Sequence, residues 1–257
     1  MTGRAGALDG LRGLAGFVRS YAIYRARPWR TRERVAFYRR FVQAGDLCFD
    51  IGAHVGNHSA AWLEIGAQVV ALEPQPQFAA FLRKEYRARQ DVTVLEQAVG
   101  RRRGPVTLMI STLAPTVSSV SADWVQEVQQ SSGFSKVDWD RSISVPMTTL
   151  DALIAAHGSP AFCKIDVEGS EAEVLAGLSQ PLPMLCFEFV PAVLTVALDC
   201  LDRLTALGDY RFNLVIGERP RFVLPDWSDV ATLRAHLQQL DPESRSGDIY
   251  ARLAASP

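Results

Sequence analysis

The chain has 257 residues, 48% of them hydrophobic, and a formal net charge of −1 at pH 7. A chain of this size can bury a full core, and an α/β domain of this length is usually one unit. No apolar run approaches the roughly 18 residues of a membrane span, and the N-terminal residues do not read as a signal peptide. Four scattered cysteines without a C-x-x-C pair suggest reduced thiols, so we expect a cytoplasmic protein without a transmembrane segment.

The first 41 residues are strongly basic. They hold ten arginines against Asp9 and Glu33, a balance of +8, so the rest of the chain carries −9. A basic arm can bind anionic lipid or nucleic acid. Four apolar side chains, however, recur at helical spacing: Leu8, Leu11, Leu14 and Phe17. We predict that residues 1–44 form a helical segment that docks on the main domain at 45–257 through these side chains, and we expect no nucleic-acid partner.

Helices and strands alternate over the next stretch. An amphipathic helix over 34–42 closed by Gly45 is followed by a buried strand over 47–51 and a helix from about Asn57. A second strand (69–72), a helix (77–89) and a third strand (92–95) come next. This alternation is typical of a parallel sheet covered by helices on both faces.

The alternation pauses after Gly100. Residues 105–110 predict an extra strand, and residues 111–142 are rich in Ser, Thr and Gln without clear periodicity. So long a stretch inside a compact domain is usually functional or disordered. We predict a lid-like insertion over a substrate pocket that Trp124, Phe134 and Trp139 would shape.

The α/β pattern then resumes. Thr149 can cap a helix, the apolar run FCKID predicts a strand, and a helix-like run follows it. A further strand over 184–189 precedes a helix that is stopped by Gly208. Residues 211–216 and 221–224 predict a terminal antiparallel hairpin.

The first three strands end in residues that suit a nucleotide. The turn FDIGAHVGNHS holds Gly52 and Gly56, led by Asp50, and opens a helix whose N-terminal amides can face a ligand. Glu73 ends the second strand, 23 residues after Asp50, where a carboxylate can accept hydrogen bonds from ribose. The third strand leads to Gln97 and Ala98, where an adenine can rest.

The turn also selects the cofactor. A dinucleotide fold uses G-x-G-x-x-G, whereas this turn is G-x-x-x-G behind an acid that would repel pyrophosphate. An acid suits a cationic sulfonium that carries an ammonium group. The turn therefore favours S-adenosyl-L-methionine, with a nucleotide-dependent oxidoreductase as the competing class.

The segment CKIDVEGSE places acids at the next strand-to-helix corner. Asp166 is our first choice of general base, because it ends the strand that runs up beside the methionine part of the cofactor. An aspartate that closes an apolar strand is also costly without partners, which favours a functional role. Lys164 can pair with a neighbouring carboxylate, Glu168 can share the chemistry or favour the next helix, and Glu171 reads as an ordinary solvated first-turn acid.

Other candidates lie near this corner. Glu188 ends the following strand, and His54 and His58 lie in the first turn, where His58 reads as a cofactor-side or packing residue. Asp166, Glu168 and Glu188 could also gather a hard cation such as Mg²⁺, but no fixed ligand spacing demands a metal.

Four stretches together resemble the FkbM family of S-adenosylmethionine-dependent methyltransferases: FDIGAHVGNHS, ALEPQP, TTLDAL and KIDVEGSE. The resemblance implies a Rossmann-like class I methyltransferase fold with a mostly parallel seven-stranded sheet, and methyl transfer mostly to hydroxyl oxygens of sugars, polyketides or related metabolites. By position, Asp50, Gly52, Gly56 and Glu73 would hold the cofactor. His54 occupies a position that is often asparagine in the family.

The sequence thus predicts an O-methyltransferase acting on a small hydroxylated metabolite, sugar or glycan. An N-methyltransferase, or a non-catalytic S-adenosylmethionine-binding module with a basic arm, remain alternatives, and a homodimer is left open. The predicted catalytic residues are Asp166, Glu168, Lys164 and His54, and Glu188 joins the three aromatics in the acceptor pocket. The predicted cofactor-binding residues are Asp50, Gly52, Ala53, Gly56, Asn57, His58, Ser59, Glu73, Pro74, Gln97 and Ala98.

Overall fold

The computed structural model describes residues 2–254, with the side chains of 2–11 and 28 left aside, and is built around one large sheet. Its seven strands follow the order β3 (Val92–Leu95), β2 (Gln68–Leu72), β1 (Leu47–Ile51), β7 (Phe162–Ile165), β8 (Met184–Phe189), β10 (Gly247–Leu253) and β9 (Tyr210–Ile216). The first five are parallel, and β10 runs antiparallel to both of its neighbours. The predicted mostly parallel, seven-stranded α/β fold is confirmed.

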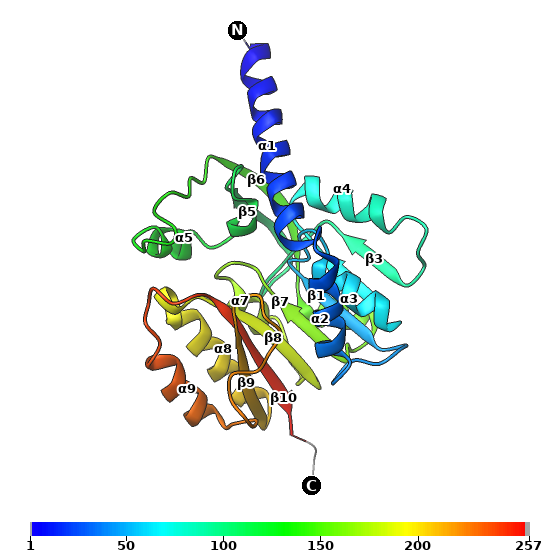
Figure 1. Ribbon diagram of the computed structural model, residues 1–257, viewed down its shortest axis with the longest axis vertical. Helices are drawn as coiled ribbons and strands as arrows, with labels where there is room; N and C mark the ends of the chain where they lie inside the picture. The colour runs from blue at the N-terminus through cyan, green and yellow to red at the C-terminus, as the bar shows by residue number, and fades with distance from the viewer. Residues whose placement is uncertain (1, 255–257) are drawn as a thin grey trace.

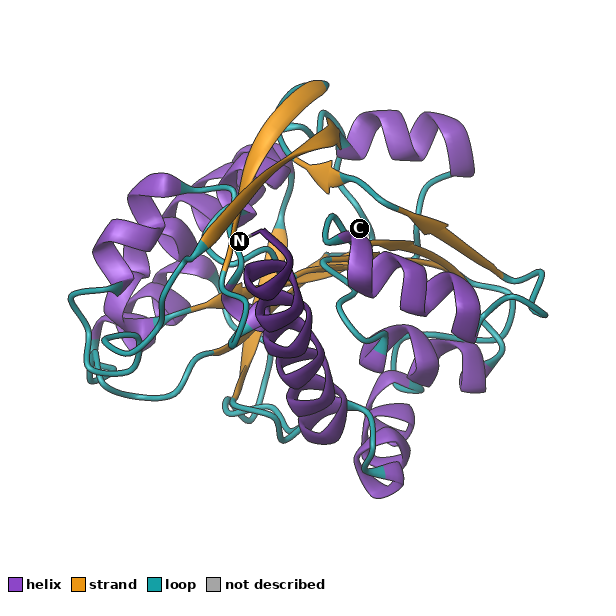
Figure 2. Ribbon diagram, turned by 90° about the horizontal axis from the view of Figure 1, so that it is seen from above, coloured by secondary structure: helices purple, strands orange, loops and turns teal. Residues whose placement is uncertain are grey.

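Helices cover both faces of this sheet (Figure 2). One face packs against α2 (Pro28–Tyr38), α3 (Asn57–Ile65) and α4 (Pro76–Glu85). The other packs against α6 (Leu150–His157), α7 (Glu171–Ala176), α8 (Leu194–Leu207) and α9 (Val230–Gln238). Within β1, Cys48 points to the first layer and Phe49 and Ile51 to the second, as the two-residue period of a strand requires.

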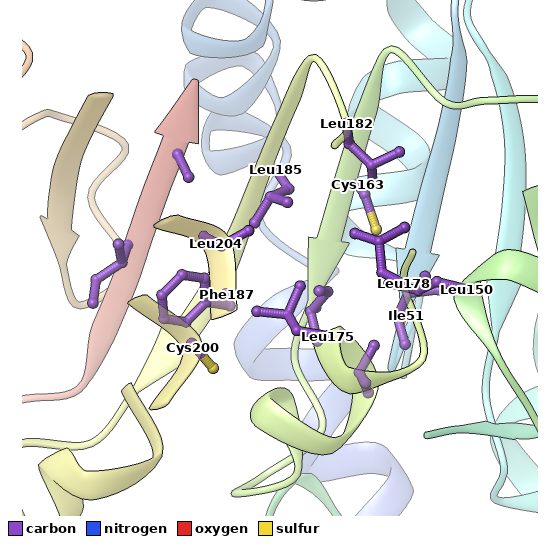
Figure 3. Close-up of a cluster of buried hydrophobic side chains, with 14 of the residues drawn as sticks. Ile51, Leu150, Cys163, Leu175, Leu178, Leu182, Leu185, Phe187, Cys200 and Leu204 are labelled. Atoms are coloured by element: carbon purple, nitrogen blue, oxygen red, sulfur yellow. The ribbon is translucent and has the colours of Figure 1, made fainter. Parts of the chain in front are cut away.

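The larger core lies on the α6–α9 face (Figure 3). There Leu185 and Phe187 of β8 meet Leu175 of α7 and Cys200 and Leu204 of α8, all of them fully buried. All four cysteines of the chain are buried and free. Because this core packs the central strands against helices α6–α9, it holds the carboxyl ends of these strands in fixed positions.

A second, three-stranded sheet interrupts the alternation. It has the order β4 (Ala98–Val99), β6 (Arg141–Thr148) and β5 (Gly104–Ile110), so the predicted extra strand is present. Between β5 and β6 the chain forms the short 3-10 helix η1 (Pro115–Val117) and α5 (Ala122–Val128). Thr149 caps α6 by accepting a hydrogen bond from the Ala152 amide, as the sequence predicted.

The partner in the terminal hairpin was predicted wrongly. Residues 221–224 form no strand, and β9 pairs instead with β10. Pro220 and Pro225 flank that segment and lack amide donors. The Asn213 side chain takes over much of the pairing, because it bonds both the amide and the carbonyl of Leu224.

The N-terminal residues form α1 (Thr2–Tyr24), which projects from the body (Figure 1). Phe17 packs against Phe78 and Phe81 of the main domain, with ring centroids 5.5 and 5.1 Å apart. Leu14 is 55% exposed and does not dock as predicted, because the helix contacts the body through Gly13, Gly16 and Phe17 instead. The side chains of Leu8 and Leu11 lie outside the described residues. No helix among residues 2–254 has the length and apolar character needed to cross a membrane.

Candidate active site

One large cavity lies across the carboxyl edge of the main sheet. Parallel strands end together at this edge, which is where open α/β sheets bind ligands. The cavity is lined near β1, β2 and β4 by Gly52, Asn57, His58, Glu73, Pro74, Gln97 and Ala98. Near β7, β8, β10 and β9 it is lined by Lys164, Asp166, Glu168, Glu188, Asp248 and Glu218. The cavity therefore joins the two sets of residues that the sequence assigned to cofactor and chemistry.

The glycine turn after β1 is shaped mainly by its protein neighbours. Gly52 has a φ of +83°, and a Cβ built there would lie 1.8 Å from the carbonyl oxygen of Asp166. Gly56 has a φ of +69°, and a Cβ there would meet Leu82 and the Tyr86 hydroxyl at 2.8 Å. Both positions thus need glycine for backbone conformation and close approach. This packing brings the β1 turn against the β7 turn, so the two halves of the cavity share one wall.

Asp50 stabilises the turn from beneath. Its carboxylate accepts hydrogen bonds from the Ser59 amide at 3.0 Å and the Ser59 hydroxyl at 2.5 Å, which ties β1 to the first turn of α3. Burial raises the pKa of Asp50 to about 6, although the bonds from Ser59 oppose the shift. The described residues that line the cavity do not include Asp50, Ser59, Ala53 or Gly56. These four predicted cofactor residues therefore shape the turn rather than line the cavity.

Glu73 lines the cavity and is held by two backbone amides. One carboxylate oxygen accepts from the His54 amide and the other from the Gln75 amide, each at 2.8 Å. Burial raises the pKa of Glu73 to about 7, against the effect of these hydrogen bonds. Each oxygen keeps a further lone pair, so the carboxylate can accept hydrogen bonds from a ligand's hydroxyl groups.

His54 and His58 have different surroundings. His54 has a φ of +49°, and burial lowers its pKa to about 4, so its imidazole is neutral at pH 7. Its Nε2 is buried and meets no partner among the described residues. His58 is hydrogen-bonded through Nδ1 to the Tyr38 hydroxyl at 2.7 Å, and burial lowers its pKa well below the usual range. A neutral His54 is a poor source of positive charge, whereas its free nitrogen can meet a ligand.

Three carboxylates gather where β7 and β8 end. Asp166, Glu168 and Glu188 each offer an oxygen, and these atoms lie within 4.8 Å of one another. Burial, and then the charge of the neighbouring acids, raises the pKa of both Glu168 and Glu188 well above the usual value. Glu168 also adopts a φ of +54°, which is uncommon for a residue with a side chain. Such a group can share a proton or hold a hard cation.

Lys164 is the cation beneath this cluster. Its ammonium group lies 2.9 Å from Asp166 Oδ2 and 2.9 Å from Asp248 Oδ1, and the side chain is 2% exposed. Burial acts to lower the pKa of Lys164, but the two carboxylates outweigh it and hold the pKa well above the usual value. The predicted pairing of Lys164 is therefore present. Its second partner, Asp248, was missed because it lies on β10 with no motif around it.

Glu171 is not an ordinary solvated acid. It is 2% exposed, and its carboxylate accepts hydrogen bonds from the amides of Val167 at 3.0 Å and Gly169 at 3.1 Å. Burial raises its pKa to about 7. The prediction was wrong because the loop before α7 folds back over the start of the helix and encloses the side chain of Glu171. Through its two hydrogen bonds, Glu171 in turn fixes the loop that carries Glu168.

The three aromatics of the inserted segment also differ from their prediction. Trp124 is 3% exposed and packs edge-on to Phe134, with ring centroids 5.7 Å apart, in a cluster with Val128 and Val193. Trp139 donates from Nε1 to the Val117 carbonyl at 2.9 Å. None of the three is among the described residues lining the cavity. They form a small core that supports the segment.

The lining residues of that segment come from η1 and its surroundings. Pro115, Thr116, Ser118 and Val120 line the cavity. The side chain of Gln75 donates to the Pro115 carbonyl at 3.1 Å, which fastens this part of the insertion to the end of β2.

The N-terminal helices contribute to the cavity as well. Tyr24 of α1 and Arg34, Phe37 and Tyr38 of α2 line it. Arg34 donates to Glu218 at 2.9 Å, which joins α2 to the turn after β9. Sequence reasoning treated this segment as an accessory cap, because a basic helix carries no sign of the cavity it will cover.

Comparison with known proteins agrees with this arrangement. The family model for the methyltransferase FkbM domain matches residues 50–188, more than half of the chain. The hexuronic acid methyltransferase AglP of Haloferax volcanii is 27% identical over 148 residues, which cover 56% of this chain and 55% of that protein. The chain thus spans about half the length of this curated relative.

Two solved structures are similar to this chain, and the first of them shows the same fold. The crystal structure of methyltransferase FkbM from Methylobacillus flagellatus KT has a TM-score of 0.50 at 16% identity, covering 84% of this chain and 50% of that one. A precorrin-6y C5,15-methyltransferase from Geobacter metallireducens GS-15 has a TM-score of 0.45 at 13% identity, covering 87% of both chains. With the family model, the curated relative and the class I fold in agreement, the chain belongs to the FkbM family of methyltransferases and is an enzyme of that class.

Proposed function

We propose that the enzyme transfers a methyl group from S-adenosyl-L-methionine to a hydroxyl group of a sugar, and that Asp166 is the general base. The observation that carries the proposal is the position of Asp166. It directly follows β7, in the same cavity as Glu73 and beside the turn that holds Gly52. A carboxylate there can reach both the acceptor and the methyl donor.

The residues on the cofactor side fit S-adenosylmethionine. Glu73 has lone pairs for the ribose hydroxyls and is fixed by two amides. Gln97 and Ala98 would meet the adenine, and Gly52, His54 and Asn57 would surround the amino-acid part, where the buried Nε2 of His54 lacks a partner among the described residues. The acids of the cavity suit a positive charge. The bound cofactor supplies an activated methyl group on a sulfonium.

The bonding of Asp166 supports its proposed role as the base. Lys164 holds one carboxylate oxygen at 2.9 Å, and the carboxylate is 33% exposed toward the cavity. The ion pair fixes the orientation of the group, while the second oxygen remains available for an acceptor proton. A hydroxyl group is a poor nucleophile, so a positioned base should raise the rate by about 10²–10⁴-fold.

Glu168 and Glu188 would act differently from Asp166. Their raised pKa values mean that they hold protons more readily than free carboxyl groups do. Protonated carboxyl groups can donate hydrogen bonds to acceptor oxygens. They would therefore orient the acceptor while Asp166 receives its proton.

The acceptor class follows the curated relative. That protein is a hexuronic acid methyltransferase, and the present chain matches about half of it. We extend the sugar-acid acceptor to this chain as part of the proposal. Residues 111–142 would act as a lid, because 115–120 contribute to the cavity and the aromatics behind them form a stable support.

The test is a methyl-transfer assay with S-adenosylmethionine and methyl glycosides of glucuronic acid and glucose, with the methylated atom located by NMR. We expect an O-methyl ether, and Asp166→Asn should lower kcat by about 10²–10⁴-fold while S-adenosylhomocysteine still binds. Unchanged turnover in Asp166→Asn would refute the base assignment. Methylation of an amine, with a flat pH profile above the amine's pKa, would identify an N-methyltransferase, and cofactor binding without turnover on any acceptor would identify a binding module.

A further inference from the structure

Arg34 is a buried arginine with unused donors. Its side chain is 4% exposed, and among the described residues its guanidinium pairs with Glu218, whose side chain is 45% exposed. Nη1 is buried and meets no partner within the described part of the chain. A buried donor without an acceptor is costly, so such an arrangement is best satisfied by a bound group.

The charges around the cavity make this nitrogen distinctive. Six acids line the cavity, whereas the only lysine or arginine side chains among its described lining residues are Lys164 and Arg34. Lys164 is already engaged by Asp166 and Asp248. Arg34 is therefore the one cationic group of the described lining that still has a free nitrogen, and an anionic group of a ligand would be repelled elsewhere in the cavity.

The position of Arg34 favours the acceptor over the cofactor. Its partner Glu218 follows β9, at the far edge of the sheet, whereas Glu73 and Gln97 follow β2 and β3 at the opposite side. Asp166 and Glu188 lie between these two ends, because β7 and β8 are central strands. A ligand that contacts both Arg34 and Asp166 would thus extend away from Glu73 and Gln97, toward the end of the cavity that we assign to the acceptor.

We propose that Arg34 binds a carboxylate of the acceptor, so that the N-terminal segment selects acidic sugars over neutral ones. This inference rests on the proposed function, since it assigns the specificity of the same site. The planar fork of arginine matches a carboxylate in a bidentate manner, which a lysine cannot reproduce. Glu218 competes for the same guanidinium and sets how strongly the acceptor is held.

The experiment compares two nearly isosteric probes, methyl β-D-glucuronoside and its uncharged glucuronamide. Binding of each is measured by calorimetry to the full chain saturated with S-adenosylhomocysteine. We expect wild type to prefer the acid by about tenfold or more, the size of a charge-assisted hydrogen bond in a buried site. Arg34→Gln should bring the ratio of the two affinities, acid over amide, close to one. Glu218→Gln should increase this ratio, because the guanidinium no longer pairs with Glu218.

Arg32→Gln is the matched control. Arg32 lies on the same helix, is exposed and is not among the described lining residues. Its replacement removes the same charge as Arg34→Gln without removing a side chain from the cavity. Its ratio should equal that of wild type. S-adenosylhomocysteine affinity and melting temperature are measured for every variant, and if Arg34→Gln fails to fold, the increase expected in Glu218→Gln decides the question.

The outcomes separate this inference from the proposed function. If S-adenosylhomocysteine does not bind wild type, the proposed function fails together with the inference. If it binds but the two sugars bind equally, or neither binds, the inference about Arg34 is overturned while the cofactor assignment stands. The inference about Arg34 is also overturned if Arg34→Gln still prefers the acid, or if Arg32→Gln abolishes the preference as well.

Discussion

The buried Lys164 and the partly buried Asp248 form an ion pair at 2.9 Å although 84 residues separate them in the chain. Lys164 lies on β7, inside the segment that matches the family, and Asp248 lies on β10, beyond it. The same ammonium group holds Asp166, so a strand outside the family segment helps to fix the proposed base.

The first prediction concerns this cation. Lys164→Met should lower the free energy of unfolding by about 3 kcal/mol, the lower end of the range for a buried ion pair, because the carboxylates left without a partner are partly exposed. Here two carboxylates lose their partner, so methyl transfer should also be lost. Urea denaturation and the methyl-transfer assay measure the two effects.

Asp248→Asn is the matched control for Lys164→Met. Lys164 then keeps Asp166 as its partner, so the loss of stability should be clearly smaller and part of the activity should remain. Equal losses in both variants would show that Asp248, rather than Asp166, is the partner that stabilises the cation.

The second prediction concerns Glu188 and pH. Its pKa is raised in the folded protein by burial and then by Glu168, so the folded state binds its proton more tightly than the unfolded state does. Its contribution to stability is present below the unfolded pKa and is lost as pH rises through the folded pKa. Glu188→Gln should thus match wild type at pH 4 and melt roughly 2–4 °C higher at pH 8.5, the size of about 1 kcal/mol in a domain of this length.

Differential scanning calorimetry of the protein without cofactor measures this difference. The control is Glu127→Gln, which changes an exposed acid on α5 outside the described lining of the cavity. Its difference from wild type should be the same at both pH values. A Glu188→Gln variant that is less stable than wild type at pH 8.5 would contradict the crowding of acids at this edge.

The third prediction concerns cofactor affinity. The pKa of Glu73 is about 7, and its ionised form accepts hydrogen bonds best. Affinity for S-adenosylhomocysteine should therefore fall, by about tenfold, as pH drops from 8 to 5 and Glu73 becomes protonated. In Glu73→Gln the affinity should be low throughout and nearly independent of pH.

Isothermal titration calorimetry at pH 5, 6, 7 and 8 measures these affinities. Glu96→Gln is the control, because Glu96 follows β3 nearby but bonds to Arg83 and is not among the described lining residues. Glu96→Gln should keep the wild-type affinity for S-adenosylhomocysteine and the wild-type dependence of this affinity on pH. A wild-type affinity that does not change with pH would disprove the proposed contact of Glu73 with the ribose.

The fourth prediction concerns the support of the inserted segment. Gly169 has a φ of +89°, and a Cβ there would lie 2.0 Å from Cγ of Trp124. Gly169→Ala should cost about 1–3 kcal/mol through overpacking and displace α5, which raises the KM for the acceptor more than the Kd of S-adenosylhomocysteine. Gly133 lies in the inserted segment, and a Cβ there would meet nothing within 4 Å. Gly133→Ala should therefore change the free energy of unfolding by less than about 0.5 kcal/mol.

Chemical denaturation and steady-state kinetics measure both glycine variants. An increase in the Kd of S-adenosylhomocysteine as large as that in the acceptor KM would mean that the Gly169–Trp124 contact supports the cofactor side instead.

Much of the sheet could be predicted from local patterns. The bounds of β1 and β3 agree with the sequence, since short apolar runs bounded by turn residues are a direct signal of buried strands. The convergence of Glu73 and Asp166 could also be predicted, because parallel strands end at one edge. These features depend on residues close to one another in the chain.

The rest depends on pairs that no local pattern reveals. Arg34 meets Glu218 across 184 residues, and the burial of Glu171 depends on how a loop folds over its own helix. Trp124 turned inward because aromatic side chains in an inserted segment gain more from a shared core than from lining a polar cavity. Prediction from sequence therefore found the chemical groups but not what surrounds them.

The place of β10 in the sheet has a consequence for how the enzyme folds during synthesis. β9 emerges from the ribosome before β10, yet β10 lies between β8 and β9 and pairs with both. Until β10 is made, β8 has an unpaired edge and β9 has no neighbour in the sheet. Because chains fold progressively from the N-terminus, the wall that carries Asp248 must be the last to form, and the nascent enzyme passes through a stage with an open, aggregation-prone edge.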